Sequence, residues 1–330
     1  MTAVVVRHPG GIEALSYESD YPVPEILDGQ VLVRNEFSGL NFIDTYYRSG
    51  LYKQEPPFIS GQEGAGRVVA VSPSVSDVQV GDQVIYMKLG AYCEYTAVLA
   101  SEVVKLPSGI SMEKALACMV QGLTAHYLVT DATVGLIQPG EWCLIYSVGS
   151  GTCQWAAQMA KLKGFKVIGT TSTTKTAPSC CDEVIVLETI AGKTYSDFSS
   201  VDIVKKVMEI TNYEGVKLIL DGIGKSTSEI SVQCLSRRGI WISFGNASGP
   251  VPPFSLLKLT PKSAFCTRPK LSDYVATKEE LNRRVREVFQ WVIDGSIDVK
   301  IDHIFPLAEA QKAHSYLESG KSKGKVLFQI

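Results

Sequence analysis

A glycine-rich turn between an apolar strand and a helix is the part of this sequence best suited to binding a charged ligand. The run Trp142–Tyr146 is short, apolar and bounded by turn residues, as expected of a strand buried on both faces. Two glycines after it let the backbone approach a pyrophosphate, whose charge meets the N–H groups and positive dipole end of the following helix. The pattern predicts a dinucleotide-binding turn made of Gly149, Ser150, Gly151 and Thr152.

The turn is imperfect, because Cys153 stands where such turns usually carry a third glycine. A cysteine side chain there would crowd the contact between helix and strand. Glycine-rich turns also occur in methyltransferases and in unrelated parallel-sheet proteins. The turn alone therefore leaves nucleotide binding and a plain structural turn as equally good interpretations.

The end of the next strand, Lys166–Thr170, bears on which cofactor binds. NAD-binding units usually place a carboxylate at this point to accept hydrogen bonds from the ribose 2′-hydroxyl. This chain instead offers Thr171, Ser172 and Lys175, and no carboxylate that would repel a 2′-phosphate. A solvated polar loop is the plain alternative, but the position favours NADPH.

Length and composition limit the class of protein. A chain of 330 residues exceeds the size of a single core and predicts two domains. A hydrophobic content of 45%, a charged content of 20% and a net charge of −2 fit a globular enzyme, and we expect no specific nucleic-acid partner. No apolar run reaches the ~18 residues needed to span a membrane, and no signal-peptide pattern opens the chain, so a cytoplasmic protein without membrane contact is expected.

The eight cysteines form no Cys-x-x-Cys pair and have no histidine partners at zinc-finger spacing. We therefore expect no metal and no disulfide framework. Most should be small buried side chains, with the adjacent Cys180 and Cys181 the most exposed.

The chain divides into three blocks. Short strand patterns separated by turns fill residues 1 to about 120, and alternating strands and helices follow to about 265, typical of a doubly wound parallel sheet. Ligands of such sheets lie outside the carboxyl ends of the strands. Those ends predict further cofactor-binding residues at Gly222, Ser243, Phe244, Gly245 and Asn246. A final helix-rich tail ends in an apolar strand and is expected to complete the first domain.

Four segments carry a resemblance that spans nearly the whole chain. They are Gly39–Tyr52, Gly61–Gly66, Gly122–Ala125 and Arg237–Gly249. The sequence resembles the zinc-free medium-chain reductases of the quinone oxidoreductase or zeta-crystallin family. The resemblance implies an α/β protein with a GroES-like β-rich catalytic domain, residues 1–122 and 266–330, and a Rossmann NADPH-binding domain, residues 123–265.

The resemblance also separates this chain from zinc alcohol dehydrogenases. Those relatives carry a cysteine near the place of Asn41 and a histidine where Gln62 stands, and neither amide is a good zinc ligand. The segment Met87–Tyr92 lacks the cysteine cluster that holds their second zinc. Direct hydride transfer from NADPH to a quinone is the reaction that the resemblance implies.

Several site residues are carried over from the family. The catalytic candidates that could bind substrate or stabilise charge on its oxygen are Asn41, Tyr46, Tyr52 and Arg268. Asn41 and Arg268 also count as cofactor-binding candidates, together with Thr124 and Tyr127. Each has a structural alternative: a turn cap for Asn41, packing for the tyrosines, an ion pair for Arg268. Leu187 replaces a family tyrosine near the phosphate, and the chain after Lys175 is short, so we expect NADPH contacts that differ in detail from those of the family.

Three other functions stay open. The same hydride could reduce the double bond of an alkenal or enone. NADPH could be bound with little turnover, as the lens and RNA-binding roles of zeta-crystallin relatives suggest. A methyltransferase would use a similar turn but gives the amino-terminal block no role. The resemblance further implies a homodimer, with Pro250–Leu259 a candidate contact.

Overall fold

The computed structural model describes residues 1–172, 177–188 and 197–330. They form two compact units, Met1–Leu123 with Val275–Ile330, and Thr124–Tyr274. The expected boundary at 265/266 falls inside β14 (Phe265–Thr267), which pairs with the sheet of the second unit. The segment after β14 also stays with that unit, because Tyr274 stacks on Tyr127.

The second unit is built on a six-stranded parallel sheet, ordered β11-β10-β9-β12-β13-β14. Its strands are β9 (Trp142–Ile145), β10 (Lys166–Ser172), β11 (Glu183–Leu187), β12 (Val216–Asp221), β13 (Leu235–Ser243) and β14. The chain adds β10 and then β11 on one side of β9, and then crosses back to add β12, β13 and β14 on the other side of β9. This is the doubly wound Rossmann arrangement expected from the sequence.

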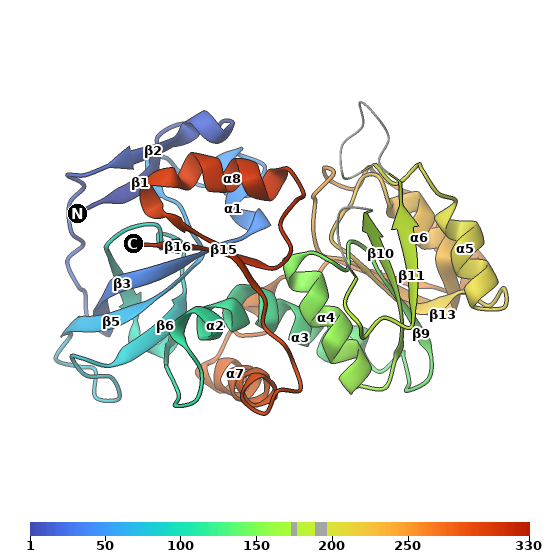
Figure 1. The fold of residues 1–330 in the computed structure, drawn as a ribbon. Helices are drawn as coiled ribbons and strands as arrows, with labels where there is room; N and C mark the ends of the chain where they lie inside the picture. Colours follow the sequence, from blue (N-terminus) through green and yellow to red (C-terminus); the bar gives the residue numbers. More distant parts are fainter. Residues whose placement is uncertain (173–176, 189–196) are drawn as a thin grey trace. The chain divides into compact units, whose positions relative to one another are not determined.

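Helices cover both faces of this sheet. They are α3 (Thr124–Val129), α4 (Gly151–Leu162), α5 (Ile203–Ile210) and α6 (Ser228–Cys234). Helix α4 buries Trp155, Ala156 and Met159 against β9 and β10, and α3 packs on α4. Helices α5 and α6 pack on each other and on the other side of the sheet (Figure 1), where Ile203 and Val207 join a core around Trp241.

The first unit is rich in β-structure, as expected. It contains β1 (Ala3–Val6), β2 (Leu15–Glu18), β3 (Gln30–Leu40), β4 (Phe58–Ile59), β5 (Glu63–Val71), β6 (Gln83–Met87), β7 (Tyr95–Leu99), β8 (Val103–Lys105), β15 (Ile301–Pro306) and β16 (Lys325–Gln329). One sheet has the order β2-β1-β4, and the other β15-β16-β3-β5-β6-β8 with β7 pairing β3. Strand β16 lies antiparallel to β3, with Leu327 opposite Gly39. The carboxyl-terminal tail therefore completes the first unit.

The helices of the first unit are α1 (Phe42–Arg48), α2 (Met112–Ala117), α7 (Lys278–Ile293) and α8 (Ala310–Glu318), with a π-helical segment at Cys118–Leu123. Helix α7 begins with a capping box, in which Thr277 and Glu280 accept each other's backbone N–H groups. Helix α8 packs on β15 and β16 (Figure 1) and adds Ala313 and Leu317 to a core that includes Phe328.

The cysteines follow the expectation with one exception. Five are buried, and Cys180 and Cys181 are half-buried in the turn before β11. The most exposed one is Cys266, on the edge strand β14, so the expectation that the adjacent pair would be the most exposed is wrong. Across the described part of the chain, no helix is both long and apolar enough to cross a bilayer.

Candidate cofactor site and buried polar cluster

The glycine-rich turn of the second unit is tied to the neighbouring strand and to its own helix. Ser147 adopts a left-handed conformation with φ 51°, and its N–H donates to Oγ1 of Thr170 at 2.9 Å. The N–H of Val148 donates to the carbonyl of the same Thr170 at 2.8 Å. The side chain of Gln154 donates to the carbonyl of Gly149 at 2.8 Å. These bonds hold the turn where α4 begins, at Gly151, with its first N–H groups at the carboxyl end of the sheet.

Cys153 is accommodated inside this arrangement, where it is only 4% exposed. The close packing beside the turn depends on a glycine of the strand instead. A β-carbon at Gly169 would lie 2.6 Å from Cγ1 of Val148 and 3.1 Å from Sγ of Cys181. Gly169 on β10 therefore allows the close packing that the third glycine of the turn, replaced here by Cys153, usually allows.

The turns after β12 and β13 approach each other as closely as backbones can. A β-carbon at Gly245 would come within 2.4 Å of the carbonyl oxygen of Gly222. The N–H of Phe244 donates to the carbonyl of Asp221 at 2.8 Å. Arg268 donates to Oγ of Ser243 and to the carbonyl of Gly245, both at 3.0 Å. The structure thus brings together most of the residues predicted at these strand ends.

Asp221 organises the turn after β12, and the sequence reasoning did not single it out. Its buried carboxylate accepts N–H groups from Ile223 at 2.9 Å and Gly224 at 3.1 Å, and the indole N–H of Trp241 at 3.1 Å. The hydroxyls of Thr227 and Ser231 donate to it as well. Burial raises the pKa of Asp221, and these bonds partly offset that effect.

The other predicted residues of the second unit lie on β10 and α3. Thr171 is buried and Ser172 half-buried at the carboxyl end of β10, whereas Lys175 lies outside the described residues. Thr124 and Tyr127 lie on α3. The ring of Tyr127 is 2% exposed and stacks on Tyr274, with 4.3 Å between centroids and 9° between planes. One face of Tyr127 is therefore covered by protein.

The remaining predicted residues, Asn41, Tyr46 and Tyr52, lie at and around α1 in the first unit. The rings of Tyr46 and Tyr52 meet edge to face, with 5.3 Å between centroids and 62° between planes. The N–H of Tyr52 donates to the carbonyl of Tyr46 at 3.0 Å. The ring of Tyr47 also meets that of Tyr52 edge to face, with 5.7 Å between centroids. These contacts fix Tyr52 beside α1 although it lies after the end of the helix.

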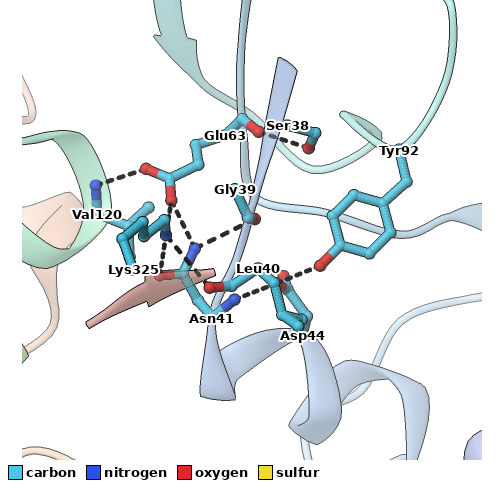
Figure 2. Close-up of polar contacts among 9 residues, drawn as sticks. All are labelled: Ser38, Gly39, Leu40, Asn41, Asp44, Glu63, Tyr92, Val120 and Lys325. Atoms are coloured by element: carbon cyan, nitrogen blue, oxygen red, sulfur yellow. Dashed lines mark hydrogen bonds and ion pairs between the residues drawn. The ribbon is translucent and has the colours of Figure 1, made fainter. Parts of the chain in front are cut away.

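Asn41 belongs to a buried polar cluster that joins four segments of the first unit (Figure 2). Its Nδ2 donates to Oε1 of Glu63 at 2.7 Å, and its Oδ1 accepts from Nζ of Lys325 at 2.9 Å. Lys325 also forms an ion pair with Glu63, and both side chains are fully buried. The second oxygen of Glu63 accepts the N–H of Val120, in the π-helical segment, at 2.8 Å.

A second carboxyl group, that of Asp44, adjoins this cluster. Its Oδ2 accepts the N–H of Asn41 at 2.8 Å and the hydroxyl of Tyr92 at 2.8 Å (Figure 2), while Oδ1 is buried without a partner. Burial raises the pKa of Asp44 to about 7. Burial and the neighbouring Asp44 carboxylate also raise the pKa of Tyr92.

The predicted residues therefore lie in both units, and the structure adds Glu63, Asp44, Lys325 and Asp221. A sequence signal existed for three of them. Glu63 and Lys325 are charged residues at the first positions of apolar strands, and Asp221 is a carboxylate at the end of one. A charge in such a place requires a partner, but the sequence does not say which one.

Amides occupy positions 41 and 62, where the resemblance implied zinc ligands in the alcohol dehydrogenases. Asn41 is engaged with charged side chains, and Gln62 offers an amide. Among the described residues, no three histidine, cysteine, aspartate or glutamate side chains are grouped so that they could hold a metal ion.

Comparison with known proteins gives consistent similarities along the chain. Residues 27–140 match the alcohol dehydrogenase GroES-like domain, and residues 186–327 match the zinc-binding dehydrogenase domain. The quinone oxidoreductase of Pseudomonas aeruginosa is 39% identical, over 96% of each chain. The 2-haloacrylate reductase of a Burkholderia species is 31% identical, over 98% of each chain.

Solved structures agree with these sequence similarities. The structure of Escherichia coli quinone oxidoreductase complexed with NADPH matches all of this chain and is itself fully covered, with a TM-score of 0.92 at 35% identity. The first unit is thus a GroES-like domain and the second a Rossmann domain. The chain belongs to the quinone oxidoreductase family of zinc-free medium-chain dehydrogenases/reductases.

Proposed function

We propose that this protein is an NADPH-dependent quinone oxidoreductase, which transfers hydride to a quinone without a metal ion. The observation that carries the proposal is the similarity along the full chain to quinone oxidoreductases, one of them solved with NADPH. The carboxyl ends of β9, β10, β12 and β13 hold the turns that such a cofactor requires.

The residues of the second unit fit NADPH. Gly222 and Gly245 leave no side chain where two backbones approach, and the turn at Gly149 leads into the twelve-residue helix α4. Thr171 and Ser172 end β10 with hydroxyls, and no carboxylate occurs from 170 to 176. A 2′-phosphate would meet hydrogen-bond donors there instead of a negative charge.

The bound nicotinamide would supply the hydride, and the protein would supply orientation and charge stabilisation. Arg268 reinforces the turn at Gly245 through its bonds to Ser243 and the glycine carbonyl. Tyr46 and Tyr52 carry aromatic faces for a planar ring and hydroxyls that can donate to an oxygen on which negative charge develops. No metal is needed, because conjugation already makes a quinone electrophilic.

The test is anaerobic oxidation of NADPH with a panel of ortho- and para-quinones, followed by the loss of NADPH absorbance. We expect turnover that depends on the acceptor and exceeds that with NADH. A protein that shows no acceptor-dependent turnover with any quinone lacks the proposed activity. Tight NADPH binding without turnover would select a binding role instead.

Reduction of an activated carbon–carbon double bond is the second candidate. It is favoured by the similarity to 2-haloacrylate reductase, whose name denotes an α,β-unsaturated acid as substrate. The same hydride would add to the β-carbon. A kcat/KM for enones or haloacrylates above that for every quinone would favour this function.

We further propose that the protein is a homodimer. Strand β14 is an edge of the parallel sheet with Phe265 43% exposed, and the preceding segment exposes Leu256 and Leu257 by 72% and 76%. Exposed apolar side chains beside an open strand edge favour pairing with a second copy. Light scattering of the purified protein should give twice the mass of one chain. The variant Leu257→Glu should lower the measured mass to that of a single chain.

We also place the protein in the cytoplasm. All eight of its cysteines are free, as expected of a chain kept in a reducing compartment. Fractionation of its native cells tests this, and recovery with the membrane fraction would contradict it.

A further inference from the structure

The buried ion pair between Glu63 and Lys325 fixes which end of the Asn41 carboxamide is which. An ammonium group only donates hydrogen bonds, so the atom of Asn41 that faces Lys325 must be the oxygen. A carboxylate only accepts, so the atom that faces Glu63 must be the nitrogen. Figure 2 shows the amide held between the two charges. Rotating the amide by half a turn would place its N–H groups against the ammonium of Lys325 and its oxygen against the carboxylate of Glu63.

The cluster also uses nearly all of the amide's hydrogen-bonding capacity. The two N–H groups of Nδ2 are directed at Glu63, at 2.7 Å, and at the carbonyl of Gly39, at 3.4 Å. The oxygen accepts one bond from Lys325, and an amide oxygen has two lone pairs. The capping box that opens α1 also directs the N–H of Asp44 at this side chain. The amide has no N–H group left over, so any further bond that it makes is one that Oδ1 accepts.

Lys325 has no N–H group left to bind a ligand, because all three are engaged. They are directed at Glu63, at Oδ1 of Asn41 and at the carbonyl of Leu40, the last at 3.2 Å. Glu63 accepts three bonds, from Lys325, from Asn41 and from the N–H of Val120. The bonds of the pair are thus made inside the cluster, where they orient Asn41.

We propose that Glu63 and Lys325 are positioning residues that present Asn41 to the cofactor or substrate as a hydrogen-bond acceptor only. Asn41 then binds a donor, such as a hydroxyl or an amide N–H group, and does not stabilise the oxygen on which negative charge develops. This changes the role expected from the sequence, where Asn41 was a candidate for that oxygen. The inference rests on the proposed function and on the expectation from the sequence that Asn41 binds NADPH or the acceptor.

An exchange of charge between the two side chains tests the proposal. In Asn41→Asp, a second carboxylate would face Glu63 where a 2.7 Å hydrogen bond now lies. In Asn41→Asp with Glu63→Gln, the cluster keeps its net charge and position 41 keeps an acceptor. Because Oε1 of Glu63 accepts from both Asn41 and Lys325, the glutamine amide that donates to position 41 gives up its bond from Lys325, and the ammonium pairs with the carboxylate introduced at position 41 instead. Kinetics with NADPH and a quinone, NADPH binding by fluorescence, and thermal unfolding would be measured for the single and double variants.

We expect Asn41→Asp to lower kcat/KM by at least about tenfold, the cost of an uncompensated charge contact, and the double variant to recover to within about threefold of the wild type. The carboxylate introduced at position 41 cannot donate a hydrogen bond in either variant. A double variant that folds like the wild type and is still as inactive as Asn41→Asp would therefore overturn the acceptor role. If the double variant recovers activity but not the melting temperature, the loss in Asn41→Asp came from the orientation of the side chain at position 41 and not from lower stability.

A matched control uses another buried amide of the same unit. Asn35 accepts the hydroxyl of Tyr86 at 2.8 Å and donates to the carbonyl of Cys93 at 2.8 Å. Tyr86→Phe removes one bond from it and should lower stability without changing kcat/KM. If the wild type shows no turnover with any acceptor, the proposed activity fails. NADPH affinity of the same variants would then still test the positioning role.

Discussion

The glycine at 245 and the carbonyl of Gly222 lie so close that a β-carbon on the former would be 2.4 Å from the latter's oxygen. This contact joins the turns after β12 and β13, at the strand ends where a nucleotide is expected to bind. The oxygen in this contact belongs to the backbone of Gly222, and a backbone cannot move aside as a flexible side chain can.

Alanine substitutions at these two glycines should differ in effect. Gly245→Ala must displace a turn, and we expect the Kd for NADPH to rise at least about tenfold, equivalent to ~1.4 kcal/mol. Gly222→Ala meets only the edge of the Phe244 ring, at 3.0 Å, and should cost less. Fluorescence titration with NADPH measures both, and Gly10→Ala, whose β-carbon would meet only side chains, is the control. Equal affinities in all three variants would contradict the close-approach argument.

Asp221 offers a test of how the same turn is supported. Asp221→Asn replaces an acceptor by an amide nitrogen that cannot accept the surrounding donors, so we expect a loss of about 2–4 kcal/mol in the free energy of unfolding. NADPH affinity should fall as well. Asp202→Asn is a matched control, since Asp202 caps α5 by accepting the N–H of Lys205 and asparagine caps equally well. Chemical denaturation measures both variants, and equal stability would show that the turn holds without the carboxylate.

The buried carboxyl of Asp44 should make stability depend on pH. Its pKa is raised to about 7, above the unfolded value of 3.8, so its contribution is greatest below about pH 4 and declines as the pH rises to about 7. Asp44→Asn should remove this decline, which amounts to roughly 2–4 kcal/mol. The measurement is the difference in unfolding free energy between variant and wild type across this range. Exposed Asp20→Asn should leave the profile unchanged, and a wild-type profile that rises from pH 4 to 7 relative to Asp44→Asn would refute the assignment.

Cofactor choice can be tested at the end of β10. Ser172→Asp would place a carboxylate where a 2′-phosphate is expected, and the kcat/KM ratio of NADPH to NADH should fall at least about tenfold. Ser172→Asn introduces a side chain of the same size as aspartate but without its charge, and it should leave the ratio nearly unchanged. If the two variants behave alike, the 2′-phosphate binds elsewhere.

Local patterns were sufficient to predict the architecture and the Rossmann turns. Each of these patterns lies within a few residues of the strand or helix that identifies it. The patterns are the run Trp142–Tyr146, the turn at Gly149 and the strand-end glycines at 222 and 245. The boundary after residue 265 was not predictable in the same way, because β14 is only three residues long and is defined by pairing with β13. Cys266 was missed as the most exposed cysteine for the same reason.

The buried cluster around Asn41 is the part that sequence reasoning could not assemble. Asn41, Glu63 and Lys325 are brought together by β3, β5 and β16, and Lys325 is 284 positions from Asn41. No periodicity or spacing connects residues at such a separation. The family resemblance pointed to Asn41, but only the two charges facing it reveal which of its atoms is available.

The placement of β16 has a consequence for how the protein is made. Residues 325–329 insert between β15 and β3, and β3 ends at Leu40. A sheet that needs β16 cannot close while that strand is still inside the ribosome. The Rossmann unit, whose strands are contiguous from 142 to 267, is complete earlier in translation and can fold first. Until β16 has been made, Glu63 lacks the ammonium of Lys325, so the first-made domain is completed by a strand that follows the Rossmann unit.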